Sequence, residues 1–362
     1  MADRIKILRQ QMKTEGVDLV VLGSGAHLEW LTSMHPHADE RPLLMCISAD
    51  NCAFLMPTLE AESARKQTRI PFFEWSDADG PNAQFARLLK QIGADNAGHV
   101  ALDETMRADF AALVEKALPQ AKRQFSASTV GALRMRKSED EYQKLKANAH
   151  TADVALQTAW AAMKPGMSES DVGQIIKESF SKQEVKPLFG IVGAGENGAF
   201  PHHQTGETLL KPGNVIVMDI GGRMDGYCSD ITRMAVLGDP PDGYADVHQI
   251  VDQAVKAALA AARPGVAAKK VDLAARKVIT DAGYGEFFVH RTGHGLGTEV
   301  HEPPYITTSS DAVLDEGMVF SIEPGIYLPG QFGIRLEEIV ILRKDGPEIL
   351  SDLSRDLVTI NV

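Results

Sequence analysis

The chain has 362 residues, and its hydrophobic (44%) and charged (24%) contents match those of globular proteins, which excludes a collagen-like or disordered chain. Its 49 acidic against 37 basic residues give a net charge of −12, so we expect neither a nucleic-acid partner nor binding to anionic membranes. Because it has no long apolar run and no paired cysteine motif, we predict a cytoplasmic protein with reduced thiols.

The first part of the chain, up to about residue 125, alternates helical and extended patterns. Ile5, Leu8 and Met12 recur at the spacing of a helix, and further helical stretches surround Ala61 and Ala111. Short apolar runs predict strands at 17–22, 43–47, 53–56 and 100–102. We therefore predict a small α/β domain that covers residues 1–130.

A second domain, residues 131–362, is predicted to begin within the polar stretch 126–137. Capping boxes at Ser138 and Ser168 each start a helix. Further helices are predicted at 247–262 and 271–282, and strands at 215–220, 230–237, 318–322 and 334–342. The pattern indicates an α+β domain made of two halves, each with helices and a hairpin.

Two predicted hairpins bring acidic residues together. In an antiparallel hairpin the numbers of directly opposed residues add to a constant that the turn sets. A turn centred between residues 224 and 226 gives pair sums of 449 to 451, and Asp219 with Asp230 gives 449. The second hairpin has a pair sum near 660, which Glu323 and Glu337 match. Each pair should therefore be directly opposed or one diagonal step apart.

Opposed carboxylates on otherwise apolar strands are costly, because like charges this close repel unless a cation lies between them. The same pattern in both halves therefore indicates a metal site. The segment His290-Arg-Thr-Gly-His294-Gly-Leu-Gly-Thr-Glu-Val-His301 adds three histidines among glycines, which oppose a regular helix and permit close approach of the backbone. An oxygen-rich site with imidazole suits manganese, cobalt or iron and tolerates zinc.

Five short blocks carry these acidic and histidine residues. They are Met218-Asp-Ile-Gly-Gly, Ser229-Asp-Ile-Thr-Arg, Gly293-His-Gly-Leu-Gly, Ser321-Ile-Glu-Pro-Gly-Ile-Tyr and Ile334-Arg-Leu-Glu. In order and spacing, the region from about Arg134 onward resembles the pita-bread metallopeptidases: methionine aminopeptidase, aminopeptidase P, prolidase and creatinase. The part before it resembles the creatinase/prolidase-type N-terminal domain. The resemblance implies a pita-bread domain with pseudo-symmetric halves after a smaller α/β domain, closest to prolidase.

By this resemblance the chain binds two divalent metal ions, with manganese expected first and cobalt, zinc or iron as the other metals. Asp219 would chelate one ion, and Asp230 and Glu337 would bridge both. His294 and Glu323 would complete the ligands of the second ion. Glu323 would also act as the catalytic proton shuttle.

The resemblance also implies residues that contact the substrate. His301 would stabilise the oxyanion of the tetrahedral intermediate, and His202, next to His203, would contact substrate near the scissile bond. Prolidases usually carry an arginine shortly after the His-Glu motif, where it holds the free carboxylate of a dipeptide. This chain has Tyr305 at that place, and its phenol could give the carboxylate one hydrogen bond but no bidentate charged contact.

The strand that carries Glu337 holds two further charged residues. Period-two alternation puts Arg335 on the same strand face as Glu337 and puts Glu338 on the opposite face. We therefore predict that Glu337, and not Glu338, is a metal ligand, and that Arg335 contributes to substrate binding.

The main functional prediction is an Xaa-Pro dipeptidase, a prolidase that hydrolyses the bond before proline in a small peptide. An Xaa-Pro aminopeptidase acting on longer peptides is one alternative, and a metal-dependent lyase or hydrolase of a small molecule on the same fold is another. A metal-free pseudoenzyme that binds peptides is disfavoured because all five ligands are present. The relatives lead us to expect a homodimer.

Overall fold

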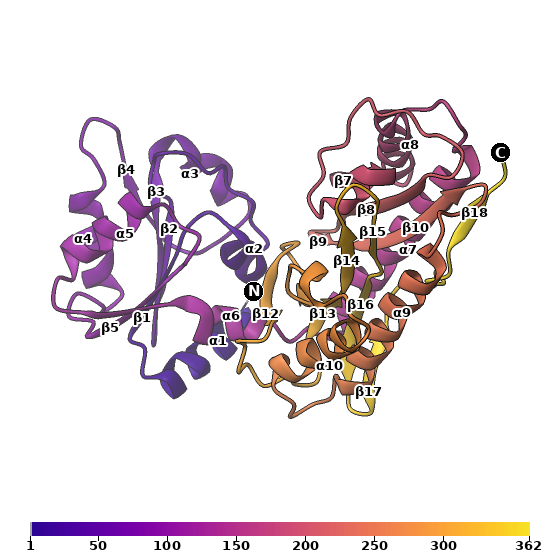
Figure 1. The fold of residues 1–362 in the computed structure, drawn as a ribbon. Helices are drawn as coiled ribbons and strands as arrows, with labels where there is room; N and C mark the ends of the chain where they lie inside the picture. The colour runs from indigo at the N-terminus through magenta and orange to yellow at the C-terminus, as the bar shows by residue number, and fades with distance from the viewer. Residues whose placement is uncertain (1) are drawn as a thin grey trace. The chain divides into compact units, whose positions relative to one another are not determined.

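The computed structural model describes residues 2–362. The chain divides into two compact units, one reaching to Arg134 and the other covering Met135–Val362 (Figure 1). In the described part of the chain no helix has the length and apolar character needed to cross a membrane.

The first unit is built on a six-stranded sheet with the spatial order β4-β3-β2-β1-β5-β6. Its strands are β1 Leu19–Leu22, β2 Leu44–Ser48, β3 Cys52–Pro57, β4 Phe72–Trp75, β5 His99–Leu102 and β6 Lys122–Phe125. Its helices are α1 Ala2–Glu15, α2 Ala26–Thr32, α3 Thr58–Arg65, α4 Asn82–Gln91, α5 Ala108–Ala117 and α6 Val130–Arg134. The predicted α/β character is confirmed, whereas α6 lies in the stretch expected to be a polar connection.

Strand β1 has an apolar sequence throughout because both of its faces are buried. Val20 and Leu22 belong to one hydrophobic cluster, and Leu19 and Val21 belong to another, so consecutive side chains pack on opposite faces of the sheet. Both faces are covered, which removes the polar alternation of a half-exposed strand. The edge strand β6, Lys122–Phe125, has a polar sequence instead, and it was not predicted for that reason.

The second unit contains two larger sheets and four long helices. The helices are α7 Glu139–Ala162, α8 Glu169–Lys182, α9 Tyr244–Ala261 and α10 Ala268–Asp281. The first sheet has β7 Lys186–Ala194, β8 Val215–Met224, β9 Tyr227–Cys228, β10 Ile231–Leu237 and β18 Val358–Ile360. The second has β11 Gly293–Gly295, β12 Glu302–Ile306, β13 Val319–Ile322, β16 Glu338–Arg343 and β17 Gly346–Ile349. A separate ladder pairs β14 Gly325–Leu328 with β15 Phe332–Arg335.

The two halves of this unit repeat the same local design. Each has a helix pair, α7 with α8 and α9 with α10, and a Pro-Gly step in which Gly166 (φ 86°) and Gly265 (φ 85°) turn the chain between the helices. The second helix of each pair begins beside an isolated antiparallel bridge, Ser168↔Leu209 in one half and Ala267↔Val313 in the other. The predicted α+β character with two matching halves is thus confirmed.

Both predicted capping boxes are present. The Ser138 side chain accepts a hydrogen bond from the Glu141 N–H, and the Glu141 carboxylate accepts one from the Ser138 backbone N–H; Ser168 and Asp171 repeat the arrangement. Such caps stabilise a helix end by about 1 kcal/mol and set where α7 and α8 begin.

The first predicted hairpin turns at Asp225-Gly226, where both residues have positive φ, as in a type I′ turn. Met224 pairs with Tyr227 and Asp219 pairs with Thr232, so the pair sum is 451, the upper end of the predicted range. Asp230 therefore lies one diagonal step from Asp219.

The second hairpin has the predicted pair sum of 660, because Ile322 pairs with Glu338 and Gly325 pairs with Arg335. Glu323 and Glu337 consequently lie opposite one another in the register. The continuous strand expected over 334–342 is wrong in one respect: it is interrupted between β15 and β16 at Leu336 and Glu337. The partner strand is interrupted between β13 and β14, so both glutamates lie in gaps of the ladder.

Candidate metal centre

A cavity of about 880 Å³ opens within the second unit. All five predicted metal ligands line it, together with His202, His203, His301 and Arg335. Tyr305 is absent from its wall, and the remaining lining residues are Phe189, Ile191, Pro201, His290, Arg291 and Val300. The structure thus brings together side chains from positions that are more than 100 residues apart.

The ligand candidates lie on strands or at strand ends. Asp219 is on β8 and His294 is on β11, whereas Asp230 precedes β10, Glu323 follows β13 and Glu337 precedes β16. Carboxylates at these strand ends can leave the pleat and approach a common point. The two sheets of the second unit therefore position these five side chains around one point.

The glycines beside His294 permit the close strand packing. A Cβ on Gly293 would lie 1.9 Å from the Ser321 carbonyl oxygen, and one on Gly295 would lie 2.3 Å from that of Pro303. Only glycine fits at both positions. The prediction that glycine lets the backbone approach closely here is confirmed, and the effect is to hold β11 tightly between its neighbours.

Asp230, His294 and Glu337 each offer a ligand atom, and these atoms lie within 4.8 Å of one another. His294 Nε2 is 3.1 Å from Glu323 Oε1 and 3.7 Å from Asp230 Oδ2. The other ring nitrogen, Nδ1, is 3.1 Å from the Gly295 carbonyl, which can hold its proton. Nε2 is therefore the nitrogen directed toward the carboxylates.

The carboxylates of the cluster ionise unequally. Burial, followed by the charges of Glu337 and Asp219, raises the pKa of Asp230 well above its usual range. Burial together with Glu323 does the same to the pKa of Glu337. For Glu323, burial opposes ionisation, but the hydrogen bond with His294 outweighs it and lowers its pKa. The protein alone does not compensate the negative charge of this cluster.

Two carboxylate oxygens of this cluster are buried and make no hydrogen bond within the described residues. They are Asp219 Oδ1 and Glu337 Oε1. With four carboxylates against the guanidinium of Arg335, the ionised cluster carries a net charge of −3. Buried charge of this kind is stable only when paired or bound to a metal. The donor set, oxygen atoms with one imidazole, therefore fits divalent cations.

A polar network supports the cluster from one side. Arg335 donates hydrogen bonds to Asp219 Oδ2, to the Tyr327 hydroxyl at 2.8 Å and to Thr232 Oγ1 at 3.1 Å. His290 Nε2 is 2.8 Å from the same Tyr327 hydroxyl. Thr232 and Tyr327 were not predicted from the sequence, although both lie inside the quoted blocks, because neither is charged.

The histidines of the cavity differ in their surroundings. The His301 ring lies 4.2 Å from that of His294, and burial, then the charges of His294 and Arg291, lower the His301 pKa to about 4. His203 Nε2 is held 2.8 Å from the buried carboxylate of Glu169. His202 is exposed and its ring has no protein partner among the described residues, so it is the one of the two that is available to a substrate.

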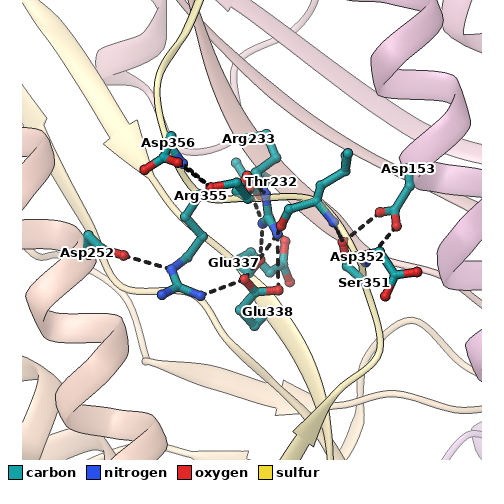
Figure 2. A network of polar contacts seen from close by, with 12 residues as sticks. Asp153, Thr232, Arg233, Asp252, Glu337, Glu338, Ser351, Asp352, Arg355 and Asp356 are labelled. Carbon is teal, nitrogen blue, oxygen red and sulfur yellow. Dashed lines mark hydrogen bonds and ion pairs between the residues drawn. The ribbon is translucent and has the colours of Figure 1, made fainter.

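Glu338 points away from the cavity, as the alternation predicts. Figure 2 shows it between Arg233 and Arg355, at 3.1 Å and 2.8 Å respectively. Arg355 in turn pairs with Asp252 at 2.8 Å. Neighbouring glutamates thus serve different purposes: Glu337 faces the cavity and Glu338 completes a buried ion-pair network.

Comparison with known proteins agrees with this geometry. Residues 143–344 match the model of metallopeptidase family M24, and residues 4–136 match the creatinase/prolidase N-terminal domain. The chain is 32% identical to an Xaa-Pro dipeptidase of Lactobacillus delbrueckii subsp. lactis over 98% of both chains. It is 35% identical to a probable dipeptidase PepE of Mycobacterium tuberculosis, and this match covers 100% of this chain and 97% of that protein.

Solved structures show the same relationship. A dipeptidase PepE from Mycobacterium ulcerans matches with a TM-score of 0.95 and 33% identity over 100% of this chain and 98% of that one. A dipeptidase from Pyrococcus horikoshii matches with a TM-score of 0.91 and 34% identity over 98% and 99%. These matches confirm the predicted pita-bread domain behind a creatinase-type N-terminal domain, and they confirm a hydrolase. The chain therefore belongs to metallopeptidase family M24.

Proposed function

We propose that this protein is an Xaa-Pro dipeptidase that requires two divalent metal ions. The observation that carries the proposal is the convergence of four carboxylates and one imidazole on the wall of a single cavity, where two of the carboxylate oxygens are buried without a hydrogen-bond partner among the described residues. Relatives that match over nearly their whole length are named Xaa-Pro dipeptidase or prolidase. The cavity volume of about 880 Å³ lies in the range of small-ligand sites.

The residues that would hold the ions are Asp219, Asp230, His294, Glu323 and Glu337. Divalent ions held there would supply Lewis acidity toward the scissile carbonyl and would lower the pKa of bound water to near neutrality. Manganese is the metal we propose, because oxygen ligands predominate and only one imidazole is present.

The chain's own residues supply proton transfer and orientation. Glu323, whose pKa is lowered, is ionised at neutral pH and can accept a proton and pass it to the leaving nitrogen. His301, with a pKa of about 4, is neutral and can donate an N–H to the developing oxyanion. His202 is exposed in the cavity and can contact the substrate beside the scissile bond.

For Arg335 we propose a positioning role in place of the predicted substrate binding. Its guanidinium already serves Asp219, Tyr327 and Thr232. These contacts favour a positioning role, in which Arg335 orients Asp219, over direct binding of substrate.

A substrate panel tests the proposal. Metal-stripped protein is reloaded with manganese and assayed with Ala-Pro, Ala-Pro-Ala and Met-Ala. We expect cleavage of Ala-Pro, little cleavage of Ala-Pro-Ala and none of Met-Ala. Failure to cleave any peptide would contradict a peptidase and favour a small-molecule lyase or hydrolase on this fold.

The second candidate is an Xaa-Pro aminopeptidase. Tyr305, at the place of the expected carboxylate-binding arginine, favours it, as does a TM-score of 0.82 and 30% identity to an X-Pro aminopeptidase from Thermotoga maritima, over 97% of this chain and 100% of that one. Faster cleavage of Ala-Pro-Ala than of Ala-Pro would identify this activity. The homodimer and the cytoplasmic location stay predictions.

A further inference from the structure

The wall of the cavity contains two arginines, Arg291 and Arg335. Arg335 is buried and forms an ion pair with Asp219. Arg291 is only partly buried, and among the described residues it has no acidic partner. It is therefore the cation of the cavity wall that is available to a negatively charged part of a ligand.

Arg291 lies close to position 305. The centre of its guanidinium is 4.8 Å from the centroid of the Tyr305 ring, in a cation–π arrangement. Tyr305 is 39% exposed and is not part of the cavity wall, whereas Arg291 is. The aromatic ring is thus a platform below the guanidinium, and the positive charge lies beside the position where the arginine of prolidases is expected.

Arg291 is also close to the reacting groups. It is the residue after His290, and it lines the same cavity as His294 and His301. The cationic group and the proposed oxyanion-binding histidine therefore line the same cavity, as a dipeptide requires, because its scissile carbonyl and its C-terminal carboxylate are separated by a single residue.

We propose that Arg291, positioned by the ring of Tyr305, binds the free C-terminal carboxylate of a dipeptide substrate. This inference rests on the proposed function, and it names the residue that recognises the free carboxylate of the dipeptide. A guanidinium gives this carboxylate two charge-assisted hydrogen bonds, which a phenol cannot do. Tyr305 then acts through Arg291 and is a positioning residue.

The test compares Ala-Pro with Ala-Pro amide, which lacks the carboxylate charge. The intact protein should prefer Ala-Pro, and Arg291→Ala should raise the KM for Ala-Pro by roughly 10- to 100-fold while the amide is little affected, because a hydrogen-bonded charge partner is lost. Arg291→Lys should show an intermediate loss. An unchanged preference in Arg291→Ala would overturn the proposal.

The role of the ring is tested separately. Tyr305→Ala should raise the KM for Ala-Pro with little effect on kcat, and Tyr305→Phe, which keeps the ring, should raise it less. An equal rise of KM in both variants would assign the effect to the hydroxyl and would contradict the proposal that the ring positions Arg291. The double variant Arg291→Ala with Tyr305→Arg should regain the preference for Ala-Pro.

A matched control is available outside the cavity. Arg343 lies 4.1 Å above the Tyr142 ring in the same kind of stack and does not line the cavity. Arg343→Ala should keep the wild-type preference for Ala-Pro. If it loses that preference as Arg291→Ala does, the effect is not specific to the cavity and the proposal fails.

Calorimetry separates this inference from the proposed function. A dipeptide analogue in which a CH₂–N bond replaces the scissile amide cannot be hydrolysed. Its affinity should fall on Arg291→Ala, with equal metal content in both proteins, even if the intact enzyme cleaves no peptide. Cleavage of Ala-Pro together with equal analogue affinities would instead retain the function and reject the role of Arg291.

Discussion

Thr232 donates a hydrogen bond of 2.9 Å to Oε2 of Glu337, and the other oxygen of that carboxylate is buried without a partner among the described residues. The Thr232 hydroxyl also accepts a hydrogen bond from Arg335 at 3.1 Å. A single hydroxyl therefore orients one proposed ligand and links it to the arginine that holds Asp219. The unpartnered oxygen of Glu337 is left free to bind a cation.

This relationship predicts the effect of Thr232→Val. Valine has nearly the same shape but cannot hold Glu337 or accept from Arg335, so metal affinity should fall by about 10- to 100-fold. Thr232→Ser keeps the hydroxyl and should bind metal nearly as well as the wild type. Titration of metal-stripped protein with manganese measures both. Equal affinities for the valine and wild-type proteins would contradict this role.

Removal of Asp230 should abolish both metal binding and activity. In Asp230→Asn one of the proposed ligand carboxylates is lost, so manganese should raise the thermal midpoint of the wild type but not that of the variant. Differential scanning calorimetry with and without manganese gives this comparison. A midpoint that rises equally in both proteins would show that Asp230 does not bind the metal.

Glu337 and Glu338 should have opposite phenotypes. Glu338→Ala removes the carboxylate that pairs with the buried Arg233, so it should destabilise the fold by about 3–5 kcal/mol. Glu337→Gln removes one of several repelling charges, so it should lose metal without destabilising the metal-stripped protein. Thermal unfolding and metal analysis of both variants check this. If Glu338→Ala lost its metal and Glu337→Gln kept it, our assignment of the two glutamates to the strand faces would be reversed.

A pH effect is expected from Glu104 in the first unit. Burial opposes its ionisation, but hydrogen bonds with His27 and Ser126 outweigh burial and hold its pKa at about 2, below the ordinary 4.5. A carboxyl with a lowered pKa stabilises the fold above pH 4.5, and this contribution disappears as the pH falls from 4.5 to about 2. Because the group is half-exposed, we expect only about 1 kcal/mol at neutral pH.

Tryptophan fluorescence isolates this effect. Trp30 and Trp75 lie in the first unit and Trp160 lies in α7, so a Trp160→Phe background reports on the first unit alone. Against this background, Glu104→Gln should lower the urea midpoint at pH 7, and the difference should shrink below pH 4.5. A difference that stays constant or grows at acidic pH would contradict the sign.

The register of both hairpins could be predicted because a tight turn determines which residues are opposed. The strand predicted at 318–322 already ends before Glu323, as β13 does, whereas the gap at Leu336 and Glu337 could not be predicted, because apolar residues continue on both sides of it. Periodicity separated Glu337 from Glu338 because side chains alternate between strand faces.

The networks around the candidate site were less accessible to sequence reasoning. Thr232 and Tyr327 are neutral residues whose contacts join different strands, so no local pattern marks them. Arg291 lies inside a quoted motif, but its position above Tyr305 follows from the pairing of distant segments. Contacts of this kind can be identified only from the tertiary structure.

The most direct measurement titrates metal-stripped protein with manganese and follows bound metal and Ala-Pro hydrolysis together. We predict saturation at two ions per chain, with activity that rises as they bind and vanishes when a chelator removes them. Full Ala-Pro hydrolysis by the stripped protein in the presence of chelator would contradict the account, because the five converging side chains would then have no metal-dependent role.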